Sequence, residues 1–233
     1  MPGSPSGSIS RVTGSPTEAR YRDGARRILP IAGAGAVFAV SFAVLAHASG
    51  FGGHAAVVMS ATTFGGAAQF AAASILGTGG GVAAAVAAAA LLNARYVPIG
   101  VTVAAEFRGH PLRRLLEAQL IVDESWALSR RRDGSYDRAL LVGAGVVMYA
   151  TWVGGTALGA LIGDTLGDPD RYGLDAAFPA LFLALLVPQV RTRRALVAAV
   201  AGGGLALALI PVTPAGVPIL AATAACLVGW TRL

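Results

Sequence analysis

The residues that could do chemistry begin with a run of small and polar side chains inside an apolar segment. Residues 60–70 read Ser-Ala-Thr-Thr-Phe-Gly-Gly-Ala-Ala-Gln-Phe. Paired glycines weaken a helix, and Ser and Thr hydroxyl groups compete for its backbone hydrogen bonds. A helix broken at Gly65 and Gly66 would expose free N–H groups and the positive end of a helix dipole, which suit a carboxylate. The freed carbonyl groups would suit an ammonium group or a cation.

Gln69 places an amide at membrane depth in the same run. In one interpretation, it helps the helix break to hold the charged ends of a small ligand. In the other, the small residues let two helices pack closely and Gln69 bonds to a neighbouring helix. Spacing alone supports both interpretations equally.

Arg95 is the only charged residue inside an apolar segment, where it lies between Asn93 and Tyr96. A lone Arg in the bilayer is costly, so it should face protein or water. Residues three apart share a helix face, so Asn93 and Tyr96 lie together while Arg95 points away from Asn93. We count Asn93 among the candidate ligand-binding residues and expect Arg95 to neutralise a carboxylate. The alternative is that Arg95 snorkels to the membrane interface.

Asp123 and Glu124 form a pair of carboxylates beside an apolar stretch. Such a pair could shuttle protons or bind Arg95, and its alternative role is a solvated helix face or an N-cap. A proton-coupled carrier would have few other titratable groups within reach, namely His47 and His54 in the first loop.

Trp152 begins a ridge of glycines that continues with Gly155, Gly159 and Gly163. A ridge of this kind packs one helix against another. Trp152 either lines a substrate cavity or packs in the core. The sequence shows no nucleophile–base pair and no His/Cys metal spacing, so it predicts no enzyme, no metal and no cofactor.

The elements that must position these residues are membrane helices. The chain has 233 residues, of which 55% are hydrophobic and 13% charged, about half the roughly 25% of soluble domains. The net charge of +6 comes from Arg at loop ends, where it orients helices rather than binding nucleic acid. Each crossing takes roughly 20 apolar residues. Charged residues are absent from the stretches 28–94, 139–163 and 195–231.

The sequence therefore predicts an all-α polytopic membrane protein with broken or re-entrant helices. We expect a disordered cytoplasmic tail over residues 1–24 and a transmembrane domain over 25–233, with a charged loop at 105–138. Gln69 and Gln189 occupy similar places, which suggests two three-segment repeats and one further segment. About seven hydrophobic segments are predicted, at 28–46, 54–76, 82–104, 139–163, 176–190, 195–211 and 215–231.

The charges raise a conflict in topology. Both the Arg-rich tail and the Arg-rich loop 105–138 should lie inside, yet three crossings between residues 28 and 104 would place that loop outside. Either segment 54–76 or segment 82–104 is re-entrant, or Leu112–Leu128 inserts as an eighth element. The glycines favour a re-entrant segment, and the number of crossings stays between six and eight.

These motifs together resemble the AzlC family of branched-chain amino acid permeases over about residues 24–230. The family pattern has His after its buried Asn-x-Arg, where this chain has Tyr96, so any proton or substrate role of that His would be absent here. The resemblance rests on residues 60–70, Leu-Asn-Ala-Arg-Tyr at 92–96, Asp123-Glu124, Gly143…Trp152…Gly155…Gly159 and the stretch 175–182.

The resemblance implies a multi-pass protein of the bacterial inner membrane with a cytoplasmic N-terminus. It implies a secondary exporter of Leu, Ile, Val and Met, coupled to the proton-motive force, that works with a small AzlD-type membrane subunit. Two alternatives stay open, a non-transporting scaffold subunit and a passive amino acid channel. The expected ligand-binding residues are Gly65, Gly66, Gln69, Asn93 and Trp152, and the expected coupling or ion-pair residues are Arg95, Asp123 and Glu124.

Overall fold

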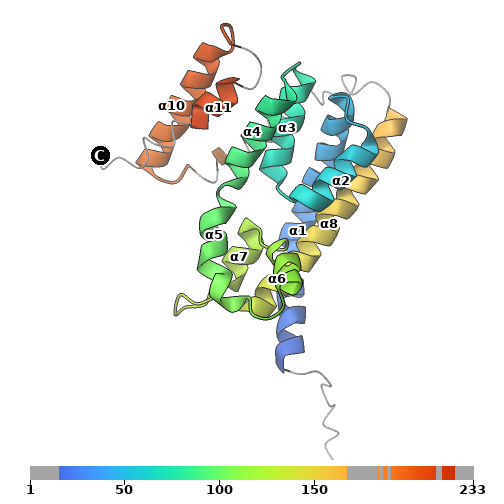
Figure 1. The fold of residues 1–233 in the computed structure, drawn as a ribbon, viewed down its shortest axis with the longest axis vertical. Helices are drawn as coiled ribbons and strands as arrows, with labels where there is room; N and C mark the ends of the chain where they lie inside the picture. Colours follow the sequence, from blue (N-terminus) through green and yellow to red (C-terminus); the bar gives the residue numbers. More distant parts are fainter. Residues whose placement is uncertain (1–15, 167–182, 184–185, 188–189, 214–216, 224–233) are drawn as a thin grey trace, which may run out of the picture.

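The computed structural model describes residues 16–166, 183, 186–187, 190–213 and 217–223, and this part of the chain contains helices and no named strand (Figure 1). The predicted all-α class is confirmed. The helices are α1 (Pro16–Ala48), α2 (Gly53–Thr63), α3 (Gly66–Gly77), α4 (Val82–Asn93), α5 (Tyr96–Val103), η1 (Ala104–Glu106), α6 (Pro111–Ala118), α7 (Asp123–Ser129), α8 (Arg138–Leu166), α10 (Arg193–Leu209) and α11 (Val217–Thr223).

Helices α1 and α8 form the central pair of the fold. Gly155 packs on Ala36, and Gly159 packs on Val40, so residue numbers rise together along the contact and the two helices run parallel. A Cβ atom on Gly159 would lie 2.6 Å from the carbonyl oxygen of Val40. Only glycine permits this approach, and the predicted packing role of the glycine ridge is confirmed.

Three helical stretches of the described residues are long and apolar enough to cross a membrane. They are Thr17–Ala48, Val82–Glu106 and Arg138–Gly163. Most of the predicted segments 176–190 and 215–231 lies outside the described residues. Gln189 also lies outside them, so the internal repeat stays a prediction.

The first residues of α1 differ from our expectation of a disordered tail. Helix α1 begins at Pro16, so the prediction is wrong for residues 16–24, while residues 1–15 lie outside the described residues. The composition of residues 16–24 did not predict a helix packed through apolar side chains. The reason is a close backbone contact, because a Cβ atom on Gly24 would lie 2.4 Å from the carbonyl oxygen of Leu140 in α8.

Helices α2 and α3 form a hairpin that enters and leaves at one end of the α1–α8 pair. At that end, Gly53 at the start of α2 lies against Ala160 of α8, and Gly77 at the end of α3 lies against Ser49, just after α1. Between them, the turn reaches the middle of α8, where the rings of Phe64 and Tyr149 meet edge to face at 5.0 Å. Neither helix is long enough to cross a bilayer alone.

This hairpin supports the predicted alternative in which segment 54–76 is re-entrant. If segment 54–76 is re-entrant, the chain crosses once in α1 and returns through Val82–Glu106. The charged loop 105–138 then lies at the same end as the first turns of α1. The ion pair between Arg20 and Asp137, 2.7 Å apart, joins those two regions directly.

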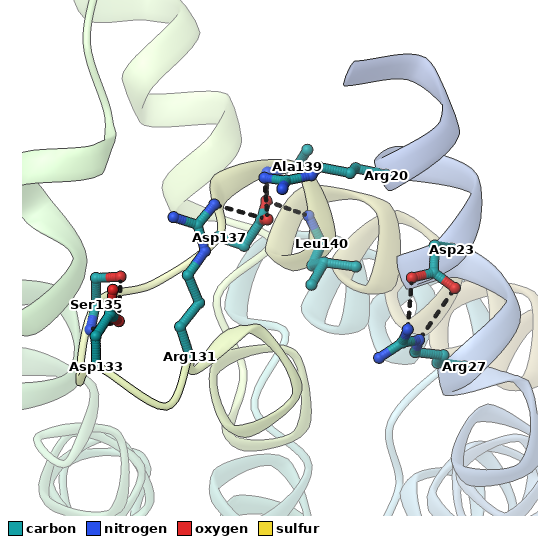
Figure 2. Close-up of polar contacts among 9 residues, drawn as sticks. All are labelled: Arg20, Asp23, Arg27, Arg131, Asp133, Ser135, Asp137, Ala139 and Leu140. Carbon is teal, nitrogen blue, oxygen red and sulfur yellow. Dashed lines mark hydrogen bonds and ion pairs between the residues drawn. The ribbon is translucent and has the colours of Figure 1, made fainter. Parts of the chain in front are cut away.

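Asp137 ties the charged end of the fold together (Figure 2). Its carboxylate accepts hydrogen bonds from Arg20 at 2.7 Å and Arg131 at 2.9 Å, and from the backbone N–H groups of Ala139 at 3.0 Å and Leu140 at 3.2 Å. Burial alone would raise the pKa of Asp137, but these hydrogen bonds and the two arginine charges outweigh it and lower the pKa. Asp137 thus caps α8 and holds α1 against it.

Glu117 makes a second junction at this end. Its buried carboxylate accepts hydrogen bonds from Arg113 of the same helix and from Arg138 at the start of α8. Burial would raise the pKa of Glu117, and the hydrogen bonds from Arg138 and Arg113 reverse that effect and lower it. Helix α6 is therefore fixed to α8 through its polar face.

Candidate functional site

The predicted helix break is present. Helix α2 ends at Thr63, Phe64 adopts a left-handed conformation with φ of 40°, and Gly65 is extended before α3 begins at Gly66. Left-handed backbone is costly for a residue with a bulky side chain, by about 1–3 kcal/mol. The contact of Phe64 with Tyr149 holds this conformation in place.

The break leaves the start of α3 without a cap. Its N-cap residue is Gly65, and no side chain of the described residues makes a capping hydrogen bond there. The carbonyl of Gly65 accepts from the N–H of Gln69 at 2.9 Å, which begins the helical ladder. The first N–H groups of α3 have no acceptor within the helix and carry the positive end of its dipole.

Asn93 lies directly against Gly65. A Cβ atom on Gly65 would lie 2.5 Å from the side-chain oxygen of Asn93, so no larger residue fits without displacing that amide. This oxygen is buried and has no hydrogen-bond partner among the described residues. A buried acceptor without a donor costs about 1–3 kcal/mol, which makes it a point of attachment for a ligand that donates.

Trp152 covers the other glycine of the pair. A Cβ atom on Gly66 would lie 2.8 Å from the edge of the Trp152 ring. The ring is itself largely buried in the main apolar cluster, together with Phe64 and Phe70. The predicted core-packing role of Trp152 is therefore confirmed, and its ring also borders the break. A role for Trp152 in lining a substrate cavity stays a prediction.

A chain of buried hydrogen bonds fixes this arrangement. The indole N–H of Trp152 donates to the side-chain oxygen of Gln69 at 3.0 Å, and the amide nitrogen of Gln69 donates to the Ser60 hydroxyl at 2.8 Å. The hydroxyl groups of Ser60 and Thr156 are 2.8 Å apart. Ser60, Gln69 and Thr156 are fully buried, so this network joins α2, α3 and α8 around the break.

The side-chain oxygen and the amide nitrogen of Gln69 are both hydrogen-bonded within the protein, which gives Gln69 a positioning role. It sets the Trp152 ring over Gly66 and holds α2 against α3. This matches the predicted alternative in which Gln69 bonds to a neighbouring helix. Direct contact between Gln69 and a ligand stays a prediction.

Sequence reasoning missed the residues that cap the end of α2. The hydroxyl of Tyr149 donates to the carbonyl of Ala61 at 2.8 Å. The amide nitrogen of Gln119 donates to the carbonyl of Thr62 at 2.9 Å and to that of Ala61 at 3.3 Å. The freed carbonyls that we expected to suit a cation are thus partly occupied by protein donors. The N–H groups at the start of α3 and the side-chain oxygen of Asn93 remain available to a ligand.

A second helix break lies beside the first. Helix α4 ends at Asn93 and α5 begins at Tyr96, but Ala94 and Arg95 keep right-handed helical backbone angles. The predicted segment 82–104 is therefore one apolar span with a local interruption. Pro98 has no N–H group and clashes with the carbonyl four residues earlier, which explains the interruption at Ala94 and Arg95. Asn93 is thus the last residue of α4, at the interruption of this span, and it lies against Gly65.

Arg95 forms the predicted ion pair. Its guanidinium lies 3.0 Å from the Asp123 carboxylate, with each side chain about half exposed. It also donates to the Tyr96 hydroxyl at 3.2 Å and lies over that ring, 5.1 Å from its centre. The residue that stands in place of the family His is therefore a direct neighbour of the only charge in this stretch of the chain.

Glu124 lies next to that pair at the start of α7. The side chain is partly buried, and burial, together with the neighbouring charge of Asp123, raises its pKa. The charge of Arg95 acts in the opposite direction but does not cancel these effects. Arg95, Asp123 and Glu124 thus form one cluster, in which burial favours the protonated form of Glu124.

The fold and the site define a polytopic helical membrane protein with discontinuous helices meeting at its centre, an arrangement found in membrane transporters. The comparisons with known proteins agree. The family model described as AzlC protein matches residues 30–166. An uncharacterized membrane protein of Archaeoglobus fulgidus is 35% identical over 151 residues, which are 60% of this chain and 68% of that protein. No solved structure matches this chain.

The chain belongs to the AzlC family, a family related to membrane transport. The family match contains the broken helix, Asn93, the charged cluster and Trp152. It ends at residue 166, whereas we expected the resemblance to continue to about residue 230. The stretch 175–182 that contributed to that expectation lies outside both the match and the described residues.

Proposed function

We propose that this protein is a secondary transporter that exports branched-chain amino acids, Leu, Ile, Val and also Met, across the bacterial inner membrane with its N-terminus in the cytoplasm. One observation carries the proposal. The uncapped start of α3 lies beside the buried oxygen of Asn93 that has no donor within the described structure. Donors and an acceptor are therefore both available at one helix break.

This pair of groups suits the two charged ends of an amino acid. The N–H groups at the start of α3 would bind the carboxylate, since a helix N-terminus favours negative charge. The oxygen of Asn93 would accept a hydrogen bond from the ammonium group, which satisfies its missing partner. A zwitterion can use both at once, whereas a simple amine or carboxylate can use only one.

The walls of the break suit an aliphatic side chain. Phe64 and Trp152 are buried beside it, and the rest of the surrounding cluster is rich in Ala and Phe. An apolar wall distinguishes single methylene groups by only about 1–3 kcal/mol. We therefore expect broad selectivity among Leu, Ile, Val and Met rather than preference for one of them.

Glu124 is the proposed coupling group. Its raised pKa allows proton binding closer to neutral pH than for an ordinary carboxyl group, and it borders the Arg95–Asp123 pair next to the second helix break. Protonation of Glu124 would leave the charge of Arg95 balanced by Asp123 alone. Movement of protons through this cluster would supply the energy for export against a gradient.

A small AzlD-type membrane subunit is the proposed partner. The span Val82–Glu106 has only 11% of its most apolar window buried, against 39% for the span in α1. Its exposed apolar residues include Val86, Val97 and Val101. This face offers enough surface for further transmembrane helices.

Efflux from cells loaded with labelled Leu tests the function. The chain, expressed with its partner, should give saturable efflux that an uncoupler reduces, and Asn93→Leu should reduce efflux at least tenfold. Thr62→Val is the matched control, since that hydroxyl bonds only within α2 at the Val58 carbonyl. Efflux that ignores the uncoupler would indicate a channel, and no efflux above empty cells would indicate a scaffold.

A further inference from the structure

Helix α6 presents an apolar face away from the protein. Leu112, Leu115 and Leu116 lie at positions i, i+3 and i+4, and their exposed fractions are 59%, 68% and 64%. Glu117 projects from the opposite side and is buried in its bonds to Arg113 and Arg138. The helix therefore contacts the rest of the protein through its polar face and exposes its apolar face. A surface helix that borders water does the opposite.

The position of α6 indicates what covers these leucines. The span Val82–Glu106 ends five residues before Pro111, and Glu117 is bonded to Arg138, the first residue of the span in α8. Helix α6 therefore lies at the level where two spans begin or end. At this depth the bilayer changes from acyl chains to headgroups.

The charges around α6 favour one kind of bilayer surface. Arg108 and Arg114 are exposed on or next to the helix, and Arg130 and Arg132 are exposed in the same loop, whereas Arg131 is bonded to Asp137. The only acid of α6 is Glu117, which arginines already neutralise. A basic surface beside exposed leucines is the pattern of helices that lie on membranes containing anionic lipids.

We infer that α6 is an interfacial helix, with its three leucines inserted at the acyl-chain boundary and its arginines bound to anionic phospholipid headgroups. The inference does not depend on the proposed function. It has a structural consequence, because α6 continues directly into Gln119, which caps the broken end of α2. Lipid contact at α6 thus fixes the segment that supports the helix break.

Fluorescence quenching tests this placement in the full-length protein. An environment-sensitive dye is attached at Leu116→Cys in a Cys226→Ser background, with Leu115→Cys as a second site if the first variant fails to fold. The protein is reconstituted in phosphatidylcholine vesicles that contain phosphatidylglycerol. Lipids brominated near the headgroup should quench the dye and aqueous iodide should not. Arg132→Cys, in the exposed loop, is the control that iodide should reach.

Two results would overturn the inference. Quenching by iodide would place α6 in water, and protection from both quenchers would show that protein, either a second copy or a partner, covers the leucines. The headgroup part has its own test. Omitting phosphatidylglycerol should reduce lipid quenching about twofold, and Arg114→Gln should abolish that dependence. Equal quenching with and without the anionic lipid would refute headgroup binding.

Discussion

The indole nitrogen of Trp152 lies 3.0 Å from the side-chain oxygen of Gln69, and this buried hydrogen bond joins α8 to α3 at the helix break. The two residues are 83 positions apart in the chain. Their contact sets the Trp152 ring over Gly66 and joins α8 to the helix that begins at the break. The break is therefore a property of three helices together and not of its glycines alone.

Replacing Gln69 with Leu should destabilise the protein. The change keeps the volume but leaves the Ser60 hydroxyl and the Trp152 indole without this partner, which should lower the free energy of unfolding by about 2–4 kcal/mol. Thermal unfolding in detergent measures the effect, with Thr62→Val as the control that should change stability little. Equal unfolding temperatures for wild type and Gln69→Leu would show that the network does not hold the break.

A methyl group on Gly66 should displace the Trp152 ring, which lies 2.8 Å from that position. Gly66→Ala should therefore lower stability and shift tryptophan fluorescence, and Trp152→Phe in the same chain should restore part of the loss. Gly33→Ala in α1 is the matched control, because nothing lies within 4 Å of its new methyl group. That control should be neutral or slightly stabilising, as Ala favours helix over Gly. Equal stability and equal tryptophan fluorescence of Gly66→Ala and Gly33→Ala would contradict close packing of Trp152 on Gly66.

The fold could be predicted largely from where charges are absent. Apolar length gave the helical class, and the Arg-rich tail and loop indicated either a re-entrant segment between them or an eighth inserted element. The order of residues 16–24 could not be predicted, since it depends on Gly24 meeting a carbonyl of α8. The interruption at Ala94 was also missed, although Pro98 was a signal for it.

The site could be predicted in part. Spacing on α3 and α4 indicated the glycines and Asn93, and the structure brings them together with Trp152. The Arg95–Asp123 pair was expected as one of two alternatives. The hydrogen-bond network of Gln69 was not predicted, yet two of its members, Trp152 and Thr156, lie four residues apart in an apolar segment, which is a usable signal. Gln119 gave no comparable signal, because its contact with the end of α2 depends on how the loop 105–138 folds back onto that helix.

Glu124 should make stability depend on pH in one direction. Because burial raises its pKa in the folded protein, the folded state binds the proton more tightly than the unfolded state, whose pKa is about 4.3. Stability should therefore fall as pH rises from that value through the folded pKa. Glu124→Gln should remove this loss and be the more stable protein at high pH.

Unfolding temperatures of wild type and Glu124→Gln, measured across the acid and neutral range, test this expectation. If the unfolding temperatures of the two proteins changed with pH in parallel, the result would contradict a buried Glu124 that binds a proton in the folded state. In the efflux assay, the same variant should also lose sensitivity to an uncoupler. Asp123→Asn serves as the comparison, because it removes the Arg95 partner instead.

Asp137 should give the opposite pH dependence. Its pKa is lowered, so its contribution is present above about pH 3.9 and is lost as pH falls through the folded pKa. Asp137→Asn should cost about 2 kcal/mol at neutral pH, because the two arginines lose the negative charge and one of the two acceptor oxygens is replaced by an NH2 group. The difference from wild type should shrink in acid. A difference that stays constant with pH would assign the loss to packing instead.

Ligand binding to the purified protein tests the central claim that the helix break recognises a zwitterion. Calorimetry compares Leu with 4-methylpentanoate, which lacks the ammonium group, and with 3-methylbutylamine, which lacks the carboxylate. Wild type should bind Leu at least tenfold more tightly than either analogue. Asn93→Leu should weaken the binding of Leu to the level of 4-methylpentanoate while leaving that analogue unchanged. Equal affinity of wild type for Leu and both analogues, or unaltered Leu binding by Asn93→Leu, would contradict the claim.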